Sequence, residues 1–168
     1  MQKDITSLEA LGIAIRDLID TQELYQKLSQ LSNNDVLKDR FMNLYYEEKK
    51  HTQLLKKKYK EMFPTVELIL PESQIPKDVL NTKQIQKLSI KDLLQLAVDG
   101  HKRAREFYLD CAETVTDLSG KRMFRFLADM KFSHQMMLSA ELEMLEKYPA
   151  YLEDVKGWEV ETRFKTEK

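Results

Sequence analysis

Residues 41–51 read Phe41-Met42-Asn43-Leu44-Tyr45-Tyr46-Glu47-Glu48-Lys49-Lys50-His51. In a helix, Glu48 and His51 would lie on the same face, one turn apart. The steps of three and four that join them also reach apolar residues, namely Phe41, Leu44, Leu55 and Met62. A carboxylate and an imidazole among such side chains need a partner that offsets the cost of their burial. The stretch therefore predicts a helix that directs a polar pair into a bundle core, as metal-binding four-helix bundles do.

The composition of the 168-residue chain favours a single helical domain. Charged residues make up 33% of it and only 4 residues are glycine, which is typical of long solvated helices. A net charge of -1 leaves no basic excess for phosphate groups, so we expect neither nucleic acid nor a membrane as partner. The absence of an apolar signal core or a membrane-spanning run predicts a cytoplasmic protein. The single Cys111 excludes an internal disulfide bond and a four-cysteine metal centre.

Four helices are predicted from apolar stripes and from residues that cap helix ends. Thr6 with Glu9, and Ser89 with Asp92, have the spacing of N-terminal capping boxes. The first helix should end near Ser32, in a turn-forming cluster, and the second should end near residue 62. The pattern is then interrupted by three prolines, namely Pro64, Pro71 and Pro76. We expect one domain over residues 1–168, with hairpins over 5–62 and 89–147, a crossover over 63–88 and a short tail over 148–168.

The two halves of the chain repeat each other at a distance of 83 residues. This shift maps Leu44 onto Leu127 and His51 onto His134 without a gap. It also pairs Leu11 with Leu94, Ala14 with Ala97, Tyr25 with Tyr108, Phe41 with Phe124, and Leu55 with Leu138. Two related hairpins joined by a long crossover make a four-helix bundle with an internal pseudo-twofold axis.

Both halves resemble the rubrerythrin-type diiron domain of the ferritin-like superfamily. The resemblance rests on residues 41–51 and 124–134 and on the tyrosine-bearing helices before them. It implies an all-α, ferritin-like four-helix bundle. The family pattern has six metal ligands, one Glu from each of the first and third helices and Glu-x-x-His from each of the other two. The corresponding residues here are Leu18, Glu48, His51, His101, Lys131 and His134.

A remodelled site follows from this correspondence, since Glu48 is the one carboxylate at the aligned positions. Other acids, namely Asp17, Glu47, Asp99 and Asp129, are expected to point away because they lie off the stripe. By the family's arrangement, His101, His134 and Glu48 would hold one ion, with His51 as a further candidate ligand. Two imidazoles and a carboxylate suit iron or zinc. The resemblance then implies an iron-dependent oxidoreductase or an iron- or peroxide-handling protein. It also implies a homodimer and a separate electron donor.

Two other interpretations remain open at the level of sequence. In one, Lys131 pairs with Glu48 and replaces the metal, so that the chain binds no ion and acts as a non-catalytic scaffold or interaction protein. In the other, a zinc ion supports hydrolysis. Tyr25 and Tyr108 would donate hydrogen bonds near the carboxylate in the family, although core packing alone also explains buried tyrosines.

Overall fold

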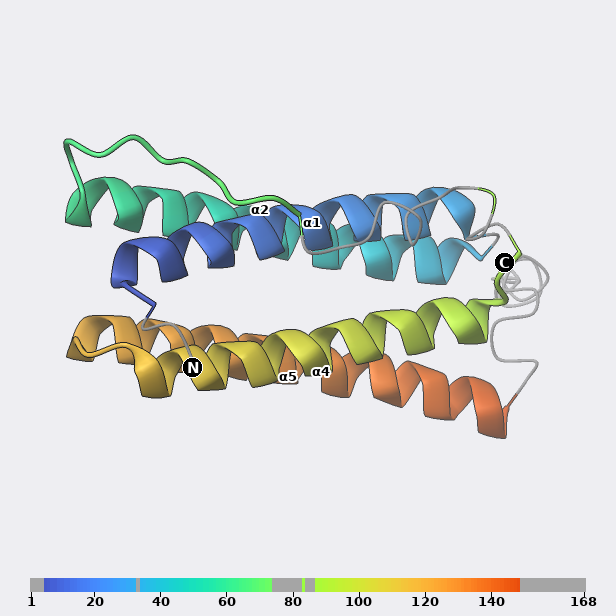
Figure 1. The fold of residues 1–168 in the computed structure, drawn as a ribbon. Coiled ribbons are helices and arrows are strands. Elements are labelled where there is room, and N and C mark those ends of the chain that lie inside the picture. Colours follow the sequence, from blue (N-terminus) through green and yellow to red (C-terminus); the bar gives the residue numbers. More distant parts are fainter. Residues whose placement is uncertain (1–4, 33, 74–82, 84–86, 149–168) are drawn as a thin grey trace, which may run out of the picture.

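The computed structural model describes residues 5–32, 34–73, 83 and 87–148. Its elements, labelled as in Figure 1, are α1 (Ser7–Leu31), α2 (Asp35–Met62), α4 (Ile90–Thr114) and α5 (Leu118–Lys147). No strand occurs in the described ranges. The prediction of an all-α bundle of four long helices is therefore confirmed.

The helices begin where the capping residues predict. The Thr6 hydroxyl accepts a hydrogen bond from the Glu9 backbone N–H, and the Glu9 carboxylate accepts one from the Thr6 backbone N–H. Ser89 and Asp92 form the same reciprocal pair at the start of α4. Because the first N–H groups of a helix have no partner within it, these contacts stabilise the start of each helix.

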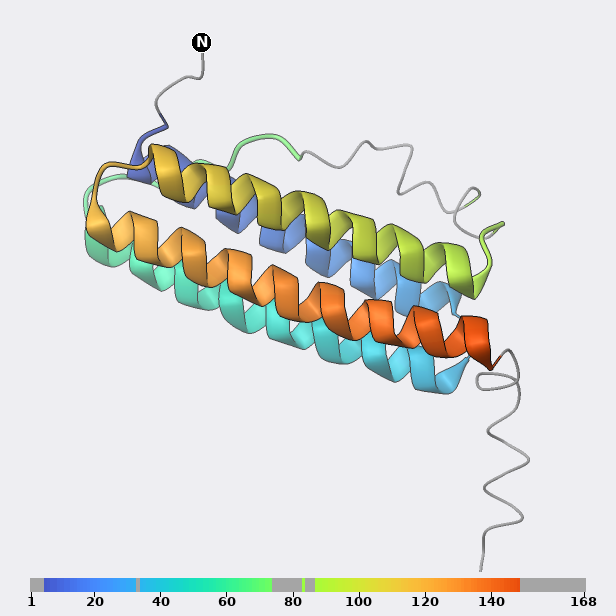
Figure 2. The same cartoon turned by 90° about the horizontal axis from the view of Figure 1, so that it is seen from below.

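The four helices form two hairpins that pack face to face. Each helix packs chiefly against its neighbour in the chain, α1 against α2 and α4 against α5. Figures 1 and 2 together show that α1 lies beside α4 and α2 beside α5, so that the hairpins form two layers. None of the described helices is long and apolar enough to cross a membrane.

The segment after α2 runs back along α1, as a crossover requires (Figure 1). Arg16 Nε donates a 2.9 Å hydrogen bond to the Pro71 carbonyl, and Ser73 Oγ donates one of 2.7 Å to Asp20 Oδ2. Successive loop residues therefore contact successive turns of α1. The remainder of the predicted crossover, except residues 83 and 87–88, and the predicted tail beyond Tyr148 lie outside the described residues.

The apolar core consists of two clusters separated by a polar layer. One cluster includes Leu18, Leu55, Tyr108 and Phe124, and the other includes Tyr25, Leu28, Phe41, Leu44 and Leu138. Along α2 and α5, the buried residues between the clusters are polar, namely Glu48, Thr52, Lys131 and His134. Full burial of each large apolar side chain contributes about 1.5–3 kcal/mol. The clusters therefore stabilise a fold that holds ionisable groups at its centre.

Candidate metal centre

Glu48 projects from α2 into the polar layer, where its side chain is 0% exposed. Lys131 Nζ, from α5, lies 3.0 Å from Glu48 Oε1. Burial by itself raises the pKa of Glu48, but the charge of Lys131 and contacts with His134 and His51 outweigh this effect and hold the pKa well below its usual range. Glu48 is therefore a buried carboxylate in its charged form.

Lys131 is equally buried and contacts a second carboxylate. Its Nζ lies 3.4 Å from Asp17 Oδ2 on α1. Burial lowers the pKa of this amine, but the charges of Asp17 and Glu48 more than compensate and raise the pKa above its ordinary value. The ammonium therefore lies between two carboxylates. The prediction that Asp17 points away is wrong, because the long lysine stem reaches a carboxylate one position off the apolar stripe.

His134 also contacts an acid that was expected to point away. Its Nε2 lies 2.8 Å from Glu47 Oε2, and its Nδ1 lies 3.4 Å from Glu48 Oε1. The prediction for Glu47 is therefore wrong, since its flexible side chain reaches the imidazole while it remains half-exposed. A carboxylate that accepts the Nε2 proton leaves Nδ1 with a free lone pair. Asp99 and Asp129 are exposed, as expected.

His101 is arranged in the same way from α4. Its Nε2 is hydrogen-bonded to the hydroxyl of Tyr25 on α1. Burial, together with the positive charge of Lys131, holds the pKa of His101 well below its ordinary value, so the ring is neutral. In the tautomer in which Nε2 donates its proton to the tyrosine oxygen, Nδ1 keeps a free lone pair.

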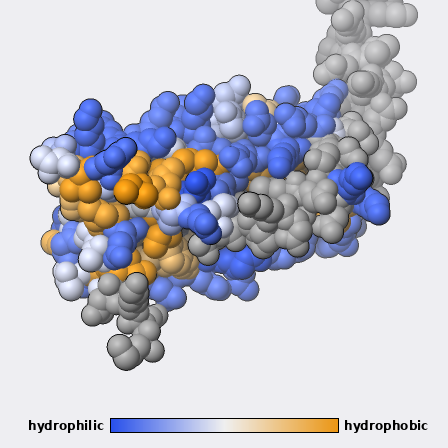
Figure 3. Space-filling model, turned by 45° about the horizontal axis from the view of Figure 1, so that its top comes forward, coloured by the Kyte–Doolittle hydropathy of each residue, from blue (hydrophilic) through white to orange (hydrophobic). Residues whose placement is uncertain are grey.

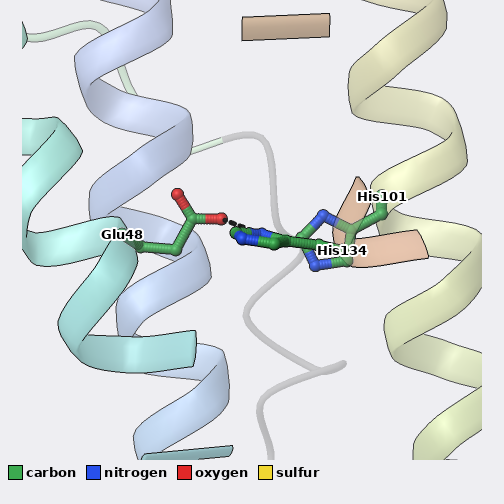
Figure 4. Close-up of side chains that lie close together, drawn as sticks. All are labelled: Glu48, His101 and His134. Atoms are coloured by element: carbon green, nitrogen blue, oxygen red, sulfur yellow. Dashed lines mark ion pairs between the residues drawn. The ribbon is translucent and has the colours of Figure 1, made fainter. Parts of the chain in front are cut away.

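Glu48, His101 and His134 form a group whose ligand atoms all lie within 4.8 Å of one another (Figure 4). In Figure 4 the His134 ring lies between the Glu48 carboxylate and the His101 ring. The second oxygen of Glu48 and Nδ1 of each histidine are buried without a hydrogen-bond partner among the described residues. Nδ1 of His51 is buried without such a partner in the described ranges as well. Buried polar atoms without partners are rare and costly, and a bound metal ion is a partner that would lower this cost.

A single ion fits these residues. Donor atoms that share one ion at about 2.0–2.2 Å lie roughly 3–3.5 Å apart, so small side-chain movements would bring the three ligands together. A pair of ions does not fit, because the Lys131 ammonium lies 3.0 Å from Glu48 Oε1 and Glu48 is the one carboxylate at the aligned positions. Two metal ions require several anionic ligands to balance their charge.

The other predicted site residues lie close to this group. His51 Nδ1 is 3.7 Å from Glu48 Oε2, at the opposite oxygen from Lys131, and is not part of the group of three. Tyr25 contacts the ligand candidate His101, whereas Tyr108 donates a hydrogen bond to Asp17. Burial, followed by the negative charge of Asp17, raises the pKa of Tyr108 well above its ordinary value, so the phenol keeps its proton.

Comparison with known families matches this arrangement. The rubrerythrin family model matches residues 9–142. The chain belongs to the rubrerythrin family. A rubrerythrin-family fold has the two hairpins and the inward-facing Glu-x-x-His positions that hold Glu48, His51, Lys131 and His134 here. No curated protein matches the chain.

A solved structure supports the same assignment. It is that of a hypothetical protein from Pyrococcus furiosus, which is 34% identical in sequence and superposes with a TM-score of 0.67. The match covers 86% of this chain and 93% of the other. The rubrerythrin-family architecture is therefore common to both proteins.

Proposed function

We propose that this protein binds one divalent metal ion per chain through Glu48, His101 and His134, and that the ion is iron, with zinc as the alternative. The supporting observation is that three ligand atoms from three helices lie within 4.8 Å of one another. Tyr25 and Glu47 engage the outer nitrogens of the two histidines, so that both unpaired nitrogens are Nδ1. This is the orientation that a metal-binding histidine pair needs.

The activity that we propose is iron-dependent oxidoreduction or the handling of iron or peroxide, with electrons from a separate donor. A bound iron ion would supply redox chemistry toward oxygen or peroxide. Glu48 would provide negative charge to the ion, and His101 and His134 would bind it as neutral ligands. Lys131 and Asp17 form an ion pair beside the ion and leave the net charge of the layer unchanged, because they add one positive and one negative group.

Metal analysis of the purified protein tests this proposal. After reconstitution with Fe(II) or Zn(II), mass spectrometry should find about one ion per chain, as three convergent ligands with open positions imply. The His134→Ala and His101→Ala variants should lose the ion, whereas His51→Ala should retain it. Less than about a tenth of an equivalent in the wild type would overturn the proposal.

A metal-free scaffold is a second candidate, favoured by the 3.0 Å contact between Lys131 and Glu48. In this case the ammonium would provide the positive charge that a metal otherwise supplies. The same metal analysis separates the two candidates. Two equivalents of iron with an oxo-bridge absorption band would contradict both, since neither includes a second ion.

We also propose that the protein forms a homodimer. Helices α2 and α5 lie side by side (Figure 2) and expose large apolar side chains to solvent, namely Tyr46, Leu54, Phe126, Phe132 and Met136. Large apolar side chains exposed to solvent lose contact with water on association, which favours it. Sedimentation equilibrium should give twice the mass of one chain, and the variant Leu54→Glu should shift the mass toward the monomer. A wild-type mass of one chain would contradict the dimer.

A further inference from the structure

A cavity of about 760 Å³ lies between α1 and α4, next to the polar layer. The α4 side of the cavity is formed by small residues, Ala97, Gly100 and Ala104, which recur at steps of three and four along one helical face. Residues of α1, namely Ile13, Arg16, Asp17, Thr21, Leu24 and Tyr25, line the opposite side. Figure 3 shows hydrophobic residues gathered on one part of the molecular surface, bordered by hydrophilic ones.

Gly100 faces open space in the part of the chain that the structure describes. A Cβ atom added to Gly100 would meet no described atom within 4 Å, apart from its chain neighbours and the backbone of its own helix. The remaining walls are largely apolar, with contributions from Ile13, Leu24, Leu96 and Phe107. A cavity of several hundred Å³ with apolar walls and a few polar groups has the usual size and composition of a small-molecule site.

The polar groups of the cavity differ in whether they are already paired. Lys131 lies between Glu48 and Asp17, and Arg16 is bound to the Pro71 carbonyl and to Asp20. Arg103 and Glu72, by contrast, make no hydrogen bond or ion pair with the described part of the chain, although both line the same space. Arg103 is thus the lining cation that is free to bind an anion. The ionised lining groups are Arg16, Arg103 and Lys131 against Asp17 and Glu72, which leaves an excess of one positive charge.

We propose that this cavity binds an amphipathic monocarboxylic acid with a hydrocarbon body, such as a medium-chain fatty acid. The carboxylate would pair with Arg103, the lining cation without a protein partner. The hydrocarbon would cover Gly100, Ala104 and Phe107 and remove apolar surface from water. A cationic amphiphile could pair with Glu72, but the lining carries an excess of one positive charge, which favours the anion over the cation.

The polar layer lies at the inner end of this site, since His101 and Lys131 also line the cavity. The far end of the hydrocarbon would therefore approach His101, one of the proposed metal ligands. Binding of the acid does not depend on a metal ion, because neither Arg103 nor Gly100 belongs to the proposed metal group. The acid site goes beyond the proposed metal function and is tested on metal-free protein, so that failure of one proposal leaves the other intact.

Isothermal titration calorimetry of metal-free protein with decanoate tests the proposal. Decanoate should bind saturably with one molecule per chain, and decylamine, which has the same chain length and the opposite charge, should bind at least about tenfold more weakly. The variant Gly100→Leu places a side chain in the cavity and should weaken decanoate binding by about tenfold or more. Gly100→Ala should weaken it less, in proportion to its smaller volume.

Charge variants on α4 provide the matched control. Arg103→Glu should weaken decanoate binding by about tenfold, as expected for the loss of a charge-assisted pair and its replacement by repulsion. Lys102→Glu makes the same change of net charge at an adjacent exposed residue that does not line the cavity, and should leave the affinity within about twofold. Thermal unfolding followed by circular dichroism shows whether each variant is folded.

Three results would overturn the proposal. The first is that the wild type shows no saturable binding of decanoate. The second is that the wild type binds decylamine as tightly as decanoate. The third is that folded Gly100→Leu and Gly100→Ala variants bind decanoate with equal affinity. If Gly100→Leu does not fold, the Arg103→Glu and Lys102→Glu pair decides alone. Equal effects of those two substitutions would then reject the site at Arg103.

Discussion

Lys131 Nζ lies 3.0 Å from Glu48 Oε1 at a depth where neither side chain is more than 1% exposed. Two opposite charges from α2 and α5 thus close the centre of the bundle. Removal of one partner leaves the other charged group buried without compensation, which costs far more than the pair itself contributes.

Lys131→Met should therefore lower the free energy of unfolding of metal-free protein by about 3–5 kcal/mol. Urea denaturation followed by circular dichroism measures this change. Lys121→Met, on the same helix and only partly buried, should stay within about 0.5 kcal/mol of the wild type. The double variant Glu48→Leu with Lys131→Met should recover much of the loss, because it also removes the buried carboxylate that would otherwise lack a partner. A loss below about 1 kcal/mol for Lys131→Met would contradict a structural role for the pair.

The metal ligands should depend on the groups that engage their outer nitrogens. Tyr25→Phe and Glu47→Gln should each weaken Zn(II) affinity by about 10- to 100-fold, because Nε2 of His101 or His134 loses the partner that orients the ring. Competition with a chromogenic chelator measures this affinity. Tyr108→Phe is the matched control, since Tyr108 contacts Asp17 and none of the three proposed ligands. Equal affinities in all three variants would show that ring orientation does not depend on these contacts.

Two glycines of the second hairpin should respond in opposite ways to alanine. Gly100→Ala should raise the free energy of unfolding by about 0.5–1 kcal/mol, because the added Cβ meets nothing within 4 Å and alanine favours the helix. Gly120→Ala should lower it by about 1–3 kcal/mol, because the added Cβ would lie 2.6 Å from Val115 Cγ1 and 3.0 Å from Asp117 Oδ1. Denaturant titration of both variants checks the difference in sign.

Acid should weaken the contact between Asp117 and α1. The Ser7 hydroxyl, and then the Gly120 backbone N–H, donate hydrogen bonds to the Asp117 carboxylate and hold its pKa below the ordinary value of 3.8. A group with a lowered folded-state pKa stabilises the fold above its unfolded pKa and loses this effect as pH falls through the folded one. The stability advantage of the wild type over Asp117→Asn should therefore be constant above pH 5 and decline below pH 3.8. Urea denaturation at a series of pH values measures it, and an advantage that grows in acid would contradict this sign.

The fold could be predicted from the sequence because its signals are local and repeated. Thr6 and Ser89 begin helices through contacts only three residues long. The repeat of 83 residues predicts that Leu44 and Leu127, and likewise Tyr25 and Tyr108, are equally buried. All four are buried in the structure. Periodicity of this kind is the strongest secondary-structure signal in a single sequence.

The site could be predicted only in part, because a helical stripe describes Cα positions and not the reach of side chains. Glu48, His101 and His134 lie together as their aligned positions imply. The contacts of Asp17 and Glu47 were not predicted, because neighbouring residues of a helix point about 100° apart. The long Lys131 side chain nevertheless reaches Asp17, and the flexible Glu47 side chain reaches His134. One signal could have found Asp17, namely that a buried ammonium has three N–H donors and needs more acceptors than a single carboxylate oxygen supplies.

The two apolar clusters on either side of the polar layer each contain residues from both hairpins. Leu18 and Leu55 meet Tyr108 and Phe124 in one cluster, and Tyr25 and Phe41 meet Leu94 and Leu138 in the other. Neither repeat therefore contains a complete core, even though each hairpin is closed by a short local turn. A half-length chain would expose one long apolar face and would have to cover it with a second copy of itself. The two copies of the internal repeat are thus joined by both apolar clusters and by the ion-pair layer between them.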